Sequence, residues 1–96
     1  MRTYELTFIV RSDIQDEKVN ETVEQVKQWI TDQGENKVVK VDAWGRRRLA
    51  YPIADQREGH YYLFESEIEA DTIGEIERNL KLSDAVLRYL LIRQGE

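Results

Sequence analysis

The stretch RTYELTFIV, at residues 2–10, decides how the fold begins because it alternates between two kinds of side chain. Aromatic or aliphatic residues occupy one parity: Tyr4, Leu6, Phe8 and Val10. The other parity is mostly polar: Thr3, Glu5, Thr7 and Ile9. A period of two with aromatic and β-branched residues is typical of a strand that is buried on one face. We therefore expect a half-buried strand from Arg2 to Val10.

The hydrophobic period changes several times along the rest of the chain. Apolar residues at helical spacing predict a helix that Gly34 ends: Val19, Val23, Val26 and Ile30. Strands are expected over 36–44, 60–68 and 85–93, and a second helix over 70–82. Gly45 predicts a bend, after which extended structure resumes through Arg48. The Tyr51–Pro52 step predicts an extended or turn conformation, and residues 55–59 read as a polar connector.

The order of these elements is strand, helix, strand, strand, helix, strand. Two βαβ halves joined by a long hairpin form the ferredoxin-like split βαβ sandwich (βαββαβ) of the α+β class. We expect one domain over residues 1–96, with a four-stranded antiparallel sheet in the order four, one, three, two. Both helices should cover the same face of that sheet, which leaves the other face open.

Alternation in the third strand predicts which side chains lie on the open face. If Tyr62, Phe64, Ser66 and Ile68 face the helices, then Tyr61, Leu63, Glu65 and Glu67 face outward. RNA-binding sheets of this architecture stack bases on two or three aromatic side chains. Here one aromatic residue lies among several carboxylates, so the open face favours a protein partner over unstacked bases.

Composition excludes several classes of function. The net charge is -5 and there is no cysteine, so neither a disulfide framework nor a thiolate metal site is possible. No apolar run reaches membrane-spanning length, and the alternating start is unlike a signal peptide. With His60 as the one histidine and no glycine-rich phosphate loop, we expect no enzyme, no metal, no cofactor and no small-molecule substrate. A cytoplasmic protein is indicated.

The stretch GRRRLAYPIA, at residues 45–54, runs against the overall acidity because it holds three consecutive arginines. A local basic patch on an acidic chain indicates an anionic partner, of which phosphate is the commonest. Guanidinium groups pair bidentately with phosphate and also stack on bases. On charge alone, a solvated turn with surface ion pairs remains an equal alternative.

The residues Gly45, Arg47, Arg48, Leu49, Ala50, Tyr51, Ile53 and Ala54 resemble the signature of the bacterial small-subunit ribosomal protein S six family. The opening Met1–Glu5, the length and the order of elements resemble that family as well. The resemblance implies a structural, non-catalytic component of the small ribosomal subunit. It further implies binding to the central domain of 16S rRNA together with small-subunit ribosomal protein S eighteen. A self-pairing regulatory module of the same fold is the rival, but it would have no need of the arginines.

The candidate site residues divide into two groups. The expected RNA contacts are Arg2, Arg46, Arg47, Arg48 and Arg88. Arg2 is expected near the three consecutive arginines in the sheet, and Arg88 near Arg2 if the first and last strands pair. The expected partner contacts are Trp44, Leu49, Tyr51, Tyr61 and Leu63. Alternatives stay open: Arg88 could pair with Glu5, Leu49 and Tyr51 could pack within the hairpin, and Trp44 could pack at the sheet edge. Alternate residues of an extended stretch point to opposite faces, so one of the three consecutive arginines should differ from the other two.

Overall fold

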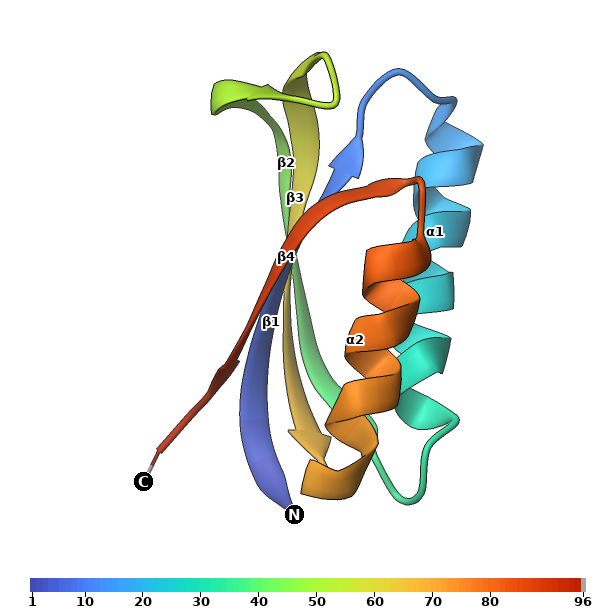
Figure 1. Ribbon diagram of the computed structural model, residues 1–96, viewed down its shortest axis with the longest axis vertical. Coiled ribbons are helices and arrows are strands. Elements are labelled where there is room, and N and C mark those ends of the chain that lie inside the picture. Colours follow the sequence, from blue (N-terminus) through green and yellow to red (C-terminus); the bar gives the residue numbers. More distant parts are fainter. Residues whose placement is uncertain (96) are drawn as a thin grey trace.

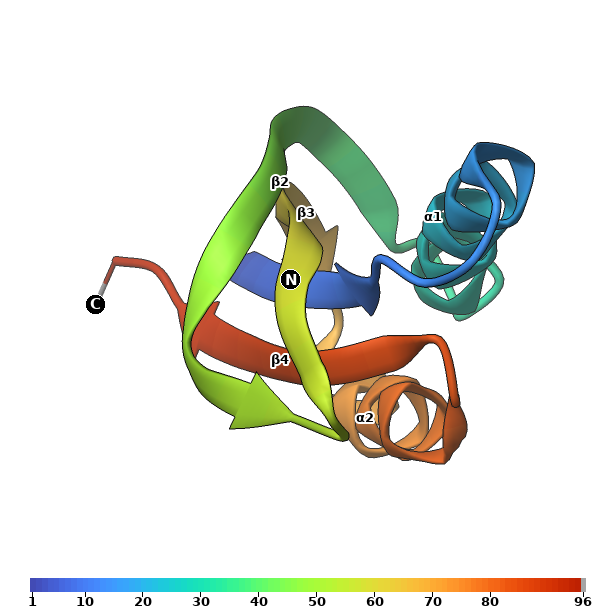
Figure 2. The same cartoon turned by 90° about the horizontal axis from the view of Figure 1, so that it is seen from above.

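The computed structural model describes residues 1–95, which form a sheet covered by two helices on one face (Figures 1 and 2). The elements are β1 (Arg2–Arg11), α1 (Asp16–Thr31), β2 (Lys37–Ile53), β3 (Gln56–Ile68), a 3-10 turn at Ala70–Thr72, α2 (Ile73–Leu82) and β4 (Val86–Arg93). The strand order is β2-β3-β1-β4 and every neighbouring pair is antiparallel. The ferredoxin-like fold and the expected strand order are thereby confirmed.

The core lies between the sheet and the helices. Leu6, Phe8, Phe64 and Ile68 of the sheet are fully buried, as are Val26 and Ile30 of α1 and Ile76 of α2. The ring of Phe8 stacks on Tyr62 with centroids 5.5 Å apart and meets Phe64 edge-on at 5.0 Å. Full burial of each such side chain stabilises the fold by about 1.5–3 kcal/mol. The inward parity expected for β1 and β3 is confirmed.

The β2–β3 hairpin is longer than the sequence indicated. β2 continues through Ile53, so the Tyr51–Pro52 step takes the extended one of its two expected conformations. Residues 56–59 of the expected polar connector belong to β3, and the chain reverses at Ala54–Asp55. These two residues have φ of 50° and 66°, as a two-residue type I′ turn requires. Residues 49–52 of β2 lie opposite a single residue of β3, Arg57, between the paired positions on either side. Pro52 is tolerated because a bulge of this kind needs no ladder bond from its missing N–H.

The far part of this hairpin, residues 45–59, is here named the distal hairpin. Figure 2 shows it bending away from the first half of β2 and crossing toward β4. Gly59 of the distal hairpin lies so close to the side chain of Ile9 that a Cβ atom at residue 59 would overlap it. The distal hairpin therefore packs against the open face of the sheet at one end and leaves the other end uncovered.

Candidate nucleic-acid and partner interface

The three consecutive arginines lie at the start of the distal hairpin and alternate in direction. Gly45 has a φ of 83°, and the β2–β3 register shifts between Ala43 and Gly45. Beyond this shift Arg46, Arg47 and Arg48 are paired in regular succession with His60, Gly59 and Glu58. Consecutive residues of a strand point to opposite faces, so Arg47 leaves the sheet on one side and its two neighbours leave on the other. All three side chains are exposed.

Arg47 belongs to a stacked column on the open face. Its guanidinium lies 6.0 Å from the centre of the Trp44 ring, and its Nε donates to the Trp44 carbonyl oxygen at 3.3 Å. The Trp44 ring in turn stacks on Tyr61, with centroids 6.4 Å apart and planes 10° from parallel. Trp44 remains 45% exposed. This part of the open face thus carries two stacked aromatic rings, where the sequence indicated one, because Trp44 follows the alternation of Asp42, which is paired with the outward Leu63.

Arg46 and Arg48 point the other way and keep donors free for an anion. Arg46 Nη1 lies 3.8 Å from Glu58 Oε1, and both side chains are about half exposed to solvent. Ion pairs of this kind contribute about 0–1 kcal/mol, so a phosphate can displace the carboxylate at small cost. Arg48 makes no ion pair with any residue from 1 to 95.

Arg88 lies beside the distal hairpin rather than beside Arg2. Antiparallel pairing sets Arg88 opposite Ile9, near the end of β1, whereas Arg2 begins that strand opposite Ile68. The expected proximity of the two arginines is therefore wrong. The alternative ion pair with Glu5 is wrong as well, because Glu5 lies opposite Ile92. The Arg88 guanidinium instead covers the Tyr51 ring at 5.3 Å from its centre, and Nη1 donates to the Tyr51 hydroxyl.

Arg2 is also far from the arginines of the distal hairpin, although the sequence indicated that it lay near them. Ile68, the partner of Arg2 on β3, is nine residues from Gly59, the partner of Arg47. At the usual rise of a strand this corresponds to roughly 30 Å. A contact made by the hairpin arginines cannot include Arg2.

Leu49 was expected to contact the partner, but its side chain is buried and only 7% exposed. Of the two roles left open for it, packing within the molecule is the one that the structure shows. Tyr51 is 52% exposed but engages Arg88. Tyr61 and Leu63 lie on the open face as expected, because they are paired with Ile9 and Thr7 of the outward parity.

The charge and polarity of the side chains on the open face change from one end of the sheet to the other. Beyond the arginines comes an apolar middle in which Leu63 is half-buried and Leu90 and Ile92 are exposed. A shallow cavity of about 380 Å³ beside Leu90 extends to Thr7 and Arg88. The far end carries the carboxylates of Glu5, Glu65 and Glu67, with Glu5 directly opposite Glu65 on the neighbouring strand and Glu67 3.6 Å from the Lys37 ammonium. Arginine, apolar and carboxylate zones therefore follow one another along the same surface.

Comparison with known proteins decides the family. The family model described as "Ribosomal protein S6" matches residues 3–93. The chain belongs to the ribosomal protein S6 family. The small ribosomal subunit protein bS6 of Moorella thermoacetica is 45% identical over 96 residues, which span all of this chain and 97% of the relative. The corresponding protein of Syntrophomonas wolfei is 42% identical, over all of this chain and 99% of the relative.

A solved structure agrees with this assignment. The crystal structure of 30S ribosomal protein S6 from Thermotoga maritima superposes with a TM-score of 0.91 at 28% identity, covering 97% of this chain and 87% of that one. This member of the S6 family is therefore a protein of the cytoplasmic small ribosomal subunit, and rRNA binding and a role in translation follow from the family. The rival, a self-pairing regulatory module, receives no support from these relatives.

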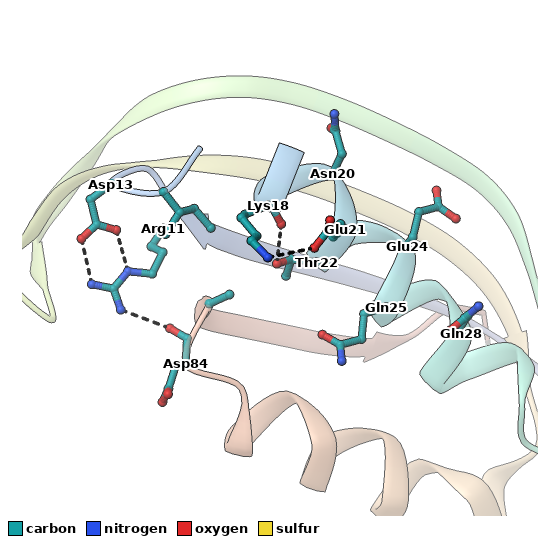
Figure 3. A pocket seen from close by; sticks show the side chains of 12 residues that line it. Arg11, Asp13, Lys18, Asn20, Glu21, Thr22, Glu24, Gln25, Gln28 and Asp84 are labelled. Atoms are coloured by element: carbon teal, nitrogen blue, oxygen red, sulfur yellow. Dashed lines mark hydrogen bonds and ion pairs between the residues drawn. The ribbon is translucent and has the colours of Figure 1, made fainter. Parts of the chain in front are cut away.

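A hollow larger than the one beside Leu90 lies on the helix side of this S6-family chain, remote from the hairpin arginines. It is a groove of about 900 Å³ between α1 and the connection from α2 to β4 (Figure 3). At its end Arg11 donates to both carboxylate oxygens of Asp13, at 2.6 and 2.9 Å, and to the Asp84 carbonyl oxygen at 3.4 Å. The hydrogen bonds from Arg11 hold the pKa of the Asp13 carboxyl below its usual range. This carboxylate is thus an ionised structural partner and is poorly suited to acid–base chemistry.

Residues 1–95 contain neither a metal-binding cluster nor a membrane-spanning helix. No three or more histidine, cysteine, aspartate or glutamate side chains in this range gather in a way that could hold a metal ion. None of the helices in the same range is both long and apolar enough to span a bilayer.

Proposed function

We propose that this protein binds the central domain of 16S rRNA together with small-subunit ribosomal protein S eighteen, and that it does so without catalytic activity. The observation that supports this most strongly is the grading of the open face. Arg47 and Arg88 lie at one end of this face, apolar side chains lie in the middle, and carboxylates lie at the other end, while Arg46 and Arg48 leave the same hairpin on its opposite side. One surface thereby offers separate places to an anionic partner and to a basic protein.

The RNA side of the proposal rests on Arg46, Arg47 and Arg48. Because these arginines alternate in direction, they suit a backbone that passes on both sides of the hairpin rather than a single flat contact. Phosphate contacts of this kind position a protein on RNA and carry little sequence information themselves. The ring of Trp44 is already stacked against Tyr61 and Arg47, so it is not open to a base on both faces. We therefore assign these residues to backbone neutralisation and not to base readout.

Arg2 is assigned a second, separate RNA contact at the opposite end of the sheet. Its side chain is exposed, and it begins β1 opposite Ile68. Arg2 lies apart from the three consecutive arginines, so its replacement should lower RNA affinity less than replacement of the hairpin arginines together.

The partner side of the proposal rests on the apolar middle and the acidic end. The residues assigned to it are Trp44, Tyr61, Leu63, Leu90 and Ile92. Aromatic and aliphatic side chains that remain exposed on a sheet face are suited to burial against another protein. The neighbouring carboxylates complement a basic partner and repel free RNA, which steers each ligand to its own zone.

The RNA contact is tested by replacing Arg46, Arg47 and Arg48 together with alanine. Binding of a central-domain rRNA fragment, measured with the partner protein present across a salt series, should weaken. The salt slope should fall by about one unit for each phosphate that the variant no longer neutralises. The matched control replaces Lys18, Lys27 and Arg78, which removes the same charge from the helix side. Equal effects of the two triple variants would show a general charge effect and refute the assignment.

The partner contact is tested with Leu90→Lys and its control Leu82→Lys. Both leucines are exposed, at 57% and 70%, but Leu82 ends α2 on the helix side. Leu90→Lys should weaken association with the S eighteen protein by tenfold or more, about 1.4 kcal/mol, while Leu82→Lys leaves it unchanged. The unaccompanied chain should bind the rRNA fragment feebly until the partner is added. Tight binding by the chain alone would overturn the joint-binding proposal.

A further inference from the structure

The distal hairpin is attached to the rest of the molecule by three polar contacts in addition to the strand ladder. On its β3 arm, Gln56 Nε2 donates to Asp13 Oδ2 at 3.1 Å and the Ser12 hydroxyl donates to the Glu58 carbonyl oxygen at 3.2 Å. On its β2 arm, the contact is the pair of Tyr51 and Arg88. The two arms are thus held from different sides, one by the β1–α1 connection and the other by β4.

The Tyr51–Arg88 pair, named the clasp, lies where the strand pairing of the β2 arm is interrupted. Residues 49–52 are the bulged stretch that lies opposite Arg57 alone, so regular strand pairing is interrupted there. Tyr51 sits within this stretch and Arg88 on the neighbouring face of β4. Without the clasp, the buried side chain of Leu49 would be the main contact that holds the β2 arm between the last regular pair, at Arg48, and the turn. The arginines lie immediately before that stretch.

The clasp combines two interactions in one pair of side chains. The guanidinium lies over the ring, 5.3 Å from its centre, and also donates a hydrogen bond to the hydroxyl. Stacking of a planar guanidinium on an aromatic ring cannot be reproduced by lysine, whose ammonium is a compact, strongly hydrated charge. Both side chains are exposed, so the clasp adds little to global stability. Its effect is local, on the conformation of the hairpin.

We infer that Arg88 is a positioning residue, which holds Tyr51 and thereby orders the β2 arm and its arginines before RNA arrives. This inference rests on the proposed function and replaces the direct phosphate contact predicted for Arg88. A hairpin that is already ordered loses less conformational entropy on binding. Loss of the clasp transfers that entropy cost to the binding step, and affinity falls although every group that touches RNA is still present.

The experiment is a double-mutant cycle with Tyr51→Leu, Arg88→Gln and the double variant. Affinity for the central-domain rRNA fragment is measured with the partner protein present, at several salt concentrations. Each single variant should lower affinity by about fivefold, the size expected of one such stacked pair. The double variant should be no worse than either single one, and the salt slope should stay unchanged. Tyr51→Phe, which keeps the ring, should lose less, and Arg88→Lys should not restore the affinity.

A direct phosphate contact by Arg88 gives the opposite pattern and would overturn the inference. In that case Arg88→Gln lowers the salt slope by about one unit, Arg88→Lys keeps most of the affinity, and Tyr51→Leu is silent. The control is Arg78→Gln, which removes the same charge from α2 on the helix side and should change neither the affinity nor the salt slope.

Amide hydrogen exchange of the free protein separates failure of the clasp from failure of the proposed function. Exchange over residues 46–53 should quicken in Tyr51→Leu and Arg88→Gln, while β1 and α1 stay as protected as before. Unchanged exchange in both variants refutes the clasp whatever the RNA data show. If exchange quickens but the triple arginine variant binds rRNA normally, the clasp stands as a hairpin anchor and the proposed function fails.

Discussion

The two faces of this sheet are built from the same strands and yet differ in almost every property. Leu6 of β1 and Leu90 of β4 lie on neighbouring strands, but Leu6 is fully buried under the helices and Leu90 is 57% exposed. One face is a dry apolar core, and the other is a graded surface of arginines, apolar groups and carboxylates. Because alternate residues serve the two faces, stability and binding can change independently in the same strand.

The difference in burial between the two faces is tested most directly by making the same side-chain truncation on each face. Leu6→Ala should destabilise the protein by about 2–5 kcal/mol, because it opens a cavity in a packed core. Leu90→Ala should change stability by no more than about 0.5 kcal/mol, since the side chain is already in water. Chemical denaturation of both variants measures the difference. Equal losses would mean that the open face is buried in solution, for example by self-association.

A second test concerns the close packing of Gly59, in the distal hairpin, against Ile9 on the open face. Gly59→Ala should cost about 1–3 kcal/mol, because the new methyl group overlaps the Ile9 side chain and β1 and β3 must shift. Gly74→Ala is the control, since nothing lies within 4 Å of the added Cβ in α2. It should be neutral or stabilise by up to about 1 kcal/mol, as alanine favours helices. Opposite signs in thermal melts would confirm that only the first glycine is required by packing.

The smallest expected effect is a change in the pKa of a tyrosine on the helix face of the sheet. Burial raises the pKa of the Tyr89 phenol, and Glu77 adds to the shift through its charge and a hydrogen bond at 3.3 Å. A phenol whose pKa is higher in the folded state contributes stability below its unfolded pKa of about 10, and this contribution is lost as pH rises further. Glu77→Gln should lower the phenol pKa in an absorbance titration, with Tyr89→Phe used for assignment. Glu75→Gln, on the same helix, should leave it in place.

The helix face could be predicted from the sequence because its signals are local. The period of two around Leu6 and Phe8 and the helical spacing around Val26 each involve a few neighbouring residues. Together with the order of elements, these patterns are sufficient for the fold and for the outward parity of Tyr61 and Leu63.

The distal hairpin could not be predicted in the same way. Pro52 is compatible with an extended or a turn conformation, and the bulge at residues 49–52 is what keeps it within β2. The turn at Ala54–Asp55 contains no glycine or asparagine, the residues that usually indicate positive φ values. The stack of Trp44 on Tyr61 joins two strands, and the clasp joins residues 37 positions apart. These features arise from the path of two strands in space, which no short window of sequence contains.

The grading of the open face also makes the molecule an electric dipole. Three consecutive arginines lie at one end of a chain whose net charge is -5, so the distal hairpin is its positive end. In the electric field of a polyanion, a protein with this charge distribution rotates before it makes contact, so the distal hairpin approaches first. Rotation of this kind raises the association rate and is weakened by salt, whereas the dissociation rate is left to the interactions formed afterwards. The acidic remainder of the molecule therefore orients the protein during its encounter with RNA.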